Sequence, residues 1–165
     1  MPTLTLFESV ADLERILPVF LVRCFVAALC GGLVGIERER RNKPAGFRTN
    51  ILICLGSAIY MAVGLLIPGA NTDSARIAAQ VVTGIGFLGA GCIIQSGHHV
   101  RGLTSAATIW VVAAIGIVVG AGFPILALIA TVIVIITLAM LRSFEHRFLG
   151  QNEPDEYQSD ADSAR

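Results

Sequence analysis

Side chains that could carry charge or chemistry are scarce inside the long apolar stretches of this sequence. Arg23 is the one ionisable residue well inside such a stretch. A charge within a membrane segment is a candidate functional residue. Arg23 also lies six residues past Leu17, about 9 Å at 1.5 Å per residue, from where a long side chain can reach the lipid headgroups. Both interpretations of Arg23 stay open.

A second set of charged residues lies at 37–48 and recurs at position 101. Glu37 and Arg41 are four residues apart, so on a helix they would share one face and pair. We hypothesise an ion-pair cluster that joins three helices at one end, made of Glu37, Arg38, Arg41, Arg48 and Arg101. The alternative is that these arginines set the orientation in the membrane and contact anionic lipid.

The remaining patterns do not indicate catalysis or a metal centre. Gly84-x-Gly86-x-x-Gly89 spells the dinucleotide fingerprint, which needs a preceding strand and an acidic residue about 20 positions later; neither is predicted here. Asp73 is the single carboxylate between positions 41 and 143, whereas hard divalent cations need several oxygen ligands. We expect no enzymatic activity, no cofactor and no metal site, and we expect the histidines at 98 and 99 to be solvated.

Composition predicts a membrane protein. Of 165 residues, 55% are apolar and 15% charged, against about 25% charged in ordinary soluble domains. The apolar residues come in blocks close to the roughly 20 residues that a span needs. The net charge is zero, which gives no support for nucleic-acid binding. All four cysteines fall inside apolar blocks, so we interpret them as packing residues and not as disulfides or zinc ligands.

Five blocks predict an all-α, polytopic bundle of about five transmembrane helices, at 17–36, 51–67, 77–94, 104–119 and 125–141. A short extracytoplasmic lead at 1–16 precedes this domain of 17–141, and an acidic tail at 142–165, expected to be disordered, follows it. Nine Lys and Arg residues lie on one side and two on the other. This bias places the N-terminus outside and the C-terminus in the cytoplasm; a re-entrant third segment would change the count.

Glycines in these blocks predict close contacts between helices. An interior glycine costs about 1 kcal/mol in a helix in water, but in lipid the helix is enforced and the missing Cβ lets a neighbouring helix approach. The predicted packing residues are Gly31, Gly35, Gly84, Gly86, Gly89, Gly91, Gly116 and Gly120. We predict that the segment 77–94 is the central and most tightly packed helix, and that the glycine-free fifth helix faces lipid.

Uncharged polar side chains form a smaller set, within the spans or at their ends: Thr49, Gln80, Thr83 and Thr104. Either Thr49 or Asn50 is predicted to cap the second helix. Transport paths contain polar or ionisable groups inside the spans. Should the chain transport an ion, we expect Gln80, Thr83 and Arg101 to line the path.

Several ordered motifs, covering about 17–141, together resemble the MgtC/SapB family. They run Gly35-Ile-Glu37-Arg38, Ala45-Gly46-Phe47-Arg48-Thr49-Asn50, Gln80-Val-Val-Thr-Gly84-Ile-Gly86-Phe-Leu-Gly89-Ala-Gly91 and Val100-Arg101-Gly102-Leu103-Thr104. The resemblance implies a multi-pass bacterial inner-membrane protein. It connects the chain to growth under magnesium limitation and survival inside host cells, and in some relatives to restraint of ATP synthase. Several relatives continue into a soluble C-terminal domain, so a short form is expected here.

From these observations we expect a protein that modulates other inner-membrane proteins during magnesium limitation or acid stress. The lipid bilayer, ATP synthase and further copies of the chain are its candidate partners. The alternative is a small transporter or channel subunit for Mg²⁺ or another ion. A membrane enzyme is the third class, and no pair of base and nucleophile in the spans supports it.

Overall fold

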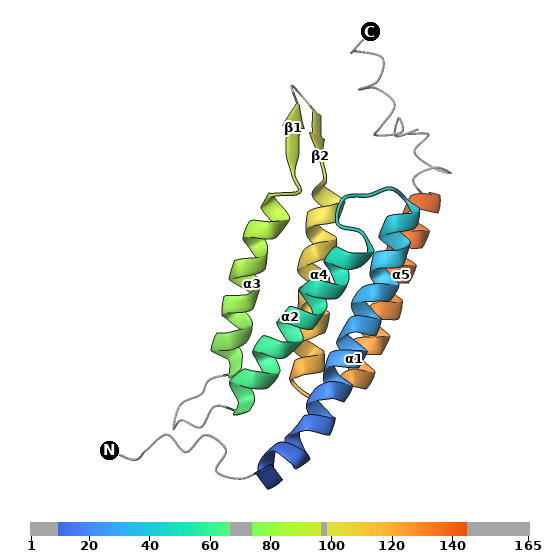
Figure 1. Cartoon of the computed structure of the whole chain (residues 1–165). Coiled ribbons are helices and arrows are strands. Elements are labelled where there is room, and N and C mark those ends of the chain that lie inside the picture. The colour runs from blue at the N-terminus through green and yellow to red at the C-terminus, as the bar shows by residue number, and fades with distance from the viewer. Residues whose placement is uncertain (1–9, 67–73, 97–98, 145–165) are drawn as a thin grey trace.

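The described part of a computed structural model, residues 10–66, 74–96 and 99–144, forms a bundle of helices with a short hairpin at one end. In chain order its elements are α1 (Val10–Arg40), α2 (Phe47–Leu66), α3 (Ser74–Ala90), β1 (Ile94–Ser96), β2 (His99–Arg101), α4 (Leu103–Gly120) and α5 (Pro124–Phe144). Successive helices alternate in direction, so the α1–α2 loop and the hairpin lie at the same end (Figure 1). The predicted all-α membrane bundle is confirmed.

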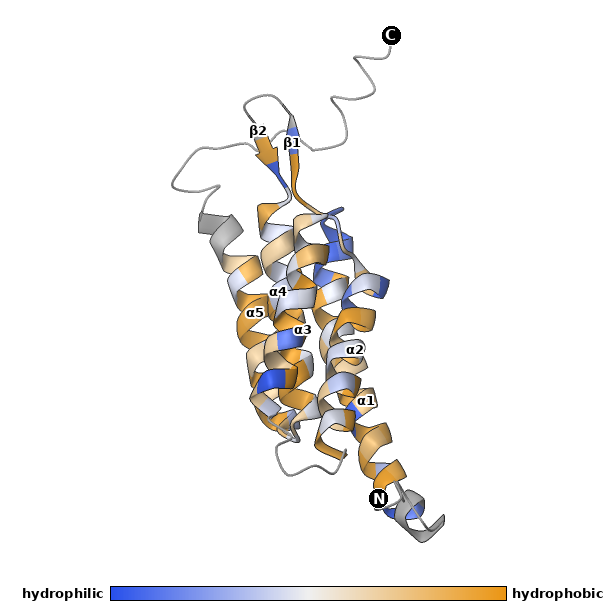
Figure 2. Ribbon diagram, turned by 90° about the vertical axis from the view of Figure 1, so that its left-hand side faces the viewer, coloured by the Kyte–Doolittle hydropathy of each residue, from blue (hydrophilic) through white to orange (hydrophobic). Residues whose placement is uncertain are grey.

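Three helices are long and apolar enough to cross a bilayer: Glu14–Arg40 within α1, Phe47–Leu66 and Leu103–Gly120. The apolar helices Ser74–Ala90 and Pro124–Met140 are shorter; 17 residues cover about 25 Å at 1.5 Å per residue, against roughly 30 Å of hydrocarbon. The number of crossings and the orientation stay predictions. Hydrophilic residues gather at the end of the bundle that carries the α1–α2 loop and the hairpin (Figure 2). This is the side on which most Lys and Arg residues were predicted to lie.

The core lies where α2 passes between α1 and α4, and the paired glycines explain why. A Cβ on Gly35 would come within 2.7 Å of Phe47 Cα, and one on Gly31 within 2.5 Å of the Asn50 carbonyl oxygen. On α4, a Cβ on Gly116 would collide with the carbonyl oxygen of Cys54. These glycines therefore bring three backbones together, as the four-residue spacing predicts.

The prediction that the segment 77–94 forms the central helix is wrong. Gly89 is the one buried residue of α3, and α3 packs at the edge of the bundle against α4 and α2 (Figure 1). A Cβ on Gly84 or Gly86 would meet nothing within 4 Å, and one on Gly91 would meet only its own turn, at Leu88 and Phe87. A Cβ on Gly89 would meet Ala106 of α4 at 3.5 Å, an ordinary packing distance. Gly84 and Gly86 have no such neighbour, so any packing role for them stays a prediction about another molecule.

Two further features concern the segment after α3 and the surface of α5. The expected loop after α3 contains a hairpin, with Ile94 opposite Arg101 and Gln95 opposite Val100; α3 therefore ends before the predicted limit of 94. The fifth helix has the exposed apolar surface expected of a helix that faces lipid, because Ile125, Val132 and Ile133 are all more than half exposed. Its buried face is narrow and consists of Ala127 and Thr131. Most of the predicted lead and tail, and His98, lie outside the described residues.

Candidate functional site

The end of the bundle that carries the α1–α2 loop holds most of its polar contacts. Glu39 Oε2 accepts a hydrogen bond of 2.7 Å from the backbone N–H of Phe47, the first residue of α2. The side-chain amide of Asn50 donates to the carbonyls of Ala45 and Gly46, at 2.5 and 2.8 Å. The structure thus differs from the predicted cap: the carboxylate of Glu39 caps α2, while Asn50 holds the preceding loop.

Arg38 is the charged residue that the fold buries most deeply among those described, at 4% exposure. Its guanidinium Nη2 donates to the hydroxyl of Ser105, which is itself buried at the start of α4. A buried charge needs hydrogen-bond partners to offset its lost hydration. Arg38 therefore ties the end of α1 to the start of α4, a link across 67 residues that the sequence pattern did not suggest.

The structure divides the predicted ion-pair cluster. Glu37 and Arg41 form the expected i, i+4 ion pair on α1. Arg48 is exposed in the first turn of α2, and Arg101 is exposed on β2. Within the described residues, neither arginine pairs with Glu37; the contact of Arg38 with Ser105 joins α1 to α4 without a shared carboxylate.

Arg23 stabilises a helix end. Its Nη1 donates to the carbonyl oxygen of Gly120 at 2.9 Å, the last residue of α4. A cation at this position satisfies an unpaired carbonyl and interacts favourably with the helix dipole. Gly122, with φ of +98°, turns the chain beside it, and a Cβ there would come within 3.1 Å of Arg23 Nη2. Arg23 thus has a structural role at the end opposite to Arg38.

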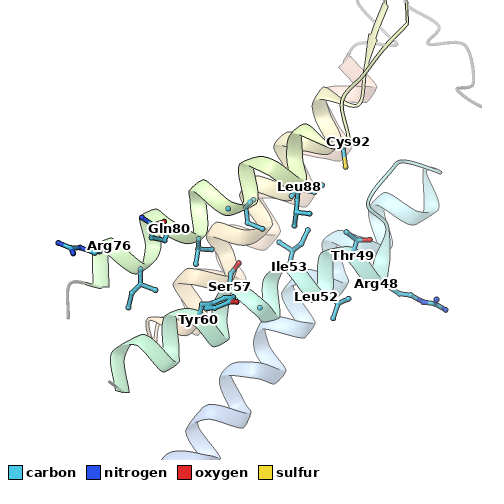
Figure 3. A pocket seen from close by; sticks show the side chains of 16 residues that line it. Arg48, Thr49, Leu52, Ile53, Ser57, Tyr60, Arg76, Gln80, Leu88 and Cys92 are labelled. Carbon is cyan, nitrogen blue, oxygen red and sulfur yellow. The ribbon is translucent and has the colours of Figure 1, made fainter. Parts of the chain in front are cut away.

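A long cleft of about 900 Å³ runs between α2 and α3, with α4 at its base. Figure 3 shows its length: Thr49 and Cys92 lie toward one end, Gln80 toward the other, and the side chains of Arg48 and Arg76 extend outward beyond the two ends. Its walls are mostly apolar; Ser57, Tyr60 and Gln80 add polar atoms in the half next to Arg76.

The residues predicted to line a transport path do not come together. Gln80 lines the cleft, whereas Thr83 is exposed and its hydroxyl donates to the Ala79 carbonyl of the same helix at 2.8 Å. Arg101 lies on the hairpin. Thr104 is exposed near the start of α4, where its carbonyl accepts from the Thr108 hydroxyl. Thr49 lines the cleft from the first turn of α2.

The outward face of α3 combines small side chains with exposure. Four small residues recur along it at the spacing of one helix face and are all exposed: Ala79, Thr83, Gly86 and Ala90. Beside them Phe87 is 82% exposed, the highest fraction among the exposed large apolar residues described. In lipid, a face of small residues permits close approach of another helix.

Comparison with known proteins identifies relatives over most of the chain. The model of the MgtC family matches residues 24–147. The Escherichia coli K12 protein named "Putative magnesium transporter YhiD" is 41% identical over 140 residues, which cover 81% of this chain and 65% of that protein. Protein MgtC of Brucella abortus is 48% identical over 116 residues, covering 70% and 48%. Protein MgtC of Salmonella typhimurium LT2 is 43% identical over 129 residues, covering 78% and 54%.

The matched stretch therefore spans about half to two thirds of the length of these relatives. No solved structure matches the chain.

Proposed function

The chain belongs to the MgtC family, and from that premise we propose that it is a non-enzymatic protein that binds and modulates another inner-membrane protein during magnesium limitation or acid stress. ATP synthase is one candidate partner. The observation that carries the proposal is the outward face of α3, where Ala79, Thr83, Gly86 and Ala90 are exposed beside Phe87. This face could accept a transmembrane helix at short distance.

Charge and polarity favour the same face for binding. The Thr83 hydroxyl is already satisfied by the Ala79 carbonyl, so it can enter an apolar contact without losing a hydrogen bond. The adjoining end of the bundle carries exposed Arg40 and Arg101. These cations would meet the acidic residues of a partner at the cytoplasmic surface and would set the orientation of the two molecules.

Site-specific crosslinking tests the proposal. A photoreactive phenylalanine analogue replaces Phe87, and a matched variant carries it at Phe25 of α1, which is 70% exposed. In cells grown at low magnesium, we expect position 87 to capture a defined inner-membrane protein and position 25 to capture lipid. Equal capture at both positions would contradict the proposal, and a product of two copies of the chain would make the partner a second subunit.

A second function has support from a relative's name. YhiD of Escherichia coli is called a putative magnesium transporter, which favours a transporter or channel subunit as the alternative. Magnesium uptake by the purified full chain in liposomes separates the two functions. The binding role predicts uptake no faster than in protein-free liposomes, and uptake that saturates with Mg²⁺ would support transport.

A further inference from the structure

The cleft between α2 and α3 has no part in the function proposed above. Its volume of about 900 Å³ is within the range of about 300–1,000 Å³ typical of ligand sites. Ala79, Thr83, Gly86 and Ala90 are absent from its lining, so the cleft and the outward face of α3 are separate surfaces.

The half of the cleft next to Arg48 matches a single acyl chain in length and polarity. Gly56 follows Arg48 by eight positions, which is about 12 Å at 1.5 Å per residue. This is close to one leaflet, half of the roughly 30 Å hydrocarbon core. Most of the wall of this half is apolar, with Leu52, Ile53 and Leu88 along it and Thr49 at its outer end. The polar Ser57 and Tyr60 begin only beyond it.

Charge at the end of this half fits an anionic headgroup. Arg48 and Arg76 are the charged residues that line the cleft, and neither Asp nor Glu is among the lining residues. Arg48 forms no ion pair within the described ranges 10–66, 74–96 and 99–144. Its side chain extends outward past the end of the cleft (Figure 3), and a guanidinium binds phosphate in a two-pronged geometry.

We propose that the cleft binds an anionic phospholipid, with one acyl chain between α2 and α3 and the phosphate held by Arg48. Two glycines keep the path open where the apolar half ends. Gly56 of α2 and Gly84 of α3 both line the cleft, and a Cβ on either would meet nothing within 4 Å. Larger side chains at these positions would fill the acyl-chain path without colliding with the protein.

Native mass spectrometry of the purified full chain in detergent tests this inference, with phosphatidylglycerol compared to phosphatidylcholine of the same acyl chains. We expect the wild type to retain phosphatidylglycerol preferentially. Arg48→Gln should weaken that binding about fivefold, whereas Arg40→Gln, an exposed arginine at the end of α1, should not. Gly84→Leu should remove both lipids.

The matched control for the acyl-chain path is Gly86→Leu. Gly86 lies on the same helix as Gly84 and also has open space around it, but it does not line the cleft. The Gly86→Leu variant should therefore bind lipid like the wild type. Should Gly84→Leu not fold, Gly56→Leu obstructs the same path from the facing wall. Equal lipid binding by Arg48→Gln and Arg40→Gln, or by Gly84→Leu and Gly86→Leu, would overturn the proposal. So would a photoreactive residue at Leu88 that captures another protein in place of lipid.

Discussion

At the scale of single residues, Arg38 and Arg23 hold helix ends together. The sequence had suggested roles for them in membrane orientation or in function. Arg38 donates to Ser105 and Arg23 to the Gly120 carbonyl. The i, i+4 pair of Glu37 and Arg41 could be predicted because its geometry is local to one helix. Contacts across 67 and 97 residues depend on which helices pack together, and spacing along the chain does not specify that.

Arg38→Ala should destabilise the bundle by about 2 kcal/mol, since it removes a buried hydrogen bond from a charged donor and leaves the Ser105 hydroxyl without it. Unfolding in a titration with a denaturing detergent, followed by the fluorescence of Trp110, measures the difference. Arg40→Ala removes an exposed arginine two residues away and should change stability little. Equal stability of the two variants would show that the Arg38–Ser105 contact contributes nothing.

Arg23→Met should lower stability by about 1 kcal/mol through loss of the cation at the C-terminus of α4. Arg15→Met serves as the control, because Arg15 is exposed near the start of α1. The same detergent titration compares them. If the two substitutions have the same small effect, Arg23 extends to the headgroups and does not cap α4.

At the scale of elements, glycine spacing predicted the packed faces of α1 and α4 but misplaced α3. A four-residue repeat of small residues shows that a face allows close approach; it does not show whether this chain supplies the opposite helix. Gly116 meets the backbone of Cys54, whereas Gly86 meets open space. The hairpin was missed because strands of three residues are too short to show an alternating pattern.

Gly116→Val should therefore be far more disruptive than Gly86→Val. A Cβ at 116 collides with the carbonyl oxygen of Cys54, and a backbone cannot yield as a flexible side chain does, so a loss of about 1–3 kcal/mol or more is expected. The fraction of monodisperse protein on gel filtration, together with the detergent titration, reports both. Similar behaviour of the two variants would mean that α2 and α4 are not in close contact.

At the scale of the whole molecule, the chain is a multi-pass protein of the bacterial inner membrane and a member of the MgtC family. Composition and block length were enough to predict the membrane bundle. They could not predict the cleft, because its walls come from α2, α3 and α4 and its existence depends on the edge position of α3. The predicted five-span topology stays a prediction, because three of the five helices are long enough to cross a bilayer and two are shorter.

That topology predicts opposite accessibility for two exposed positions in the connections. In a variant whose four native cysteines are replaced by alanine, Pro44→Cys in the α1–α2 loop should react with a membrane-impermeant maleimide only after the cells are opened. Phe123→Cys, between α4 and α5, should react in intact cells. The topology predicts three crossings between these two positions. If both cysteines react from the same side of the membrane, the number of crossings between them is even and the topology is wrong.

The central claim, that the outward face of α3 carries the function, is tested most directly by growth at low magnesium. Cells that lack the chromosomal gene would receive either the wild type or Gly86→Leu, each verified to reach the membrane in equal amount. We predict that Gly86→Leu fails to restore growth, because the larger side chain prevents close approach of the partner while the fold is unchanged. Full restoration of growth by Gly86→Leu would contradict the account.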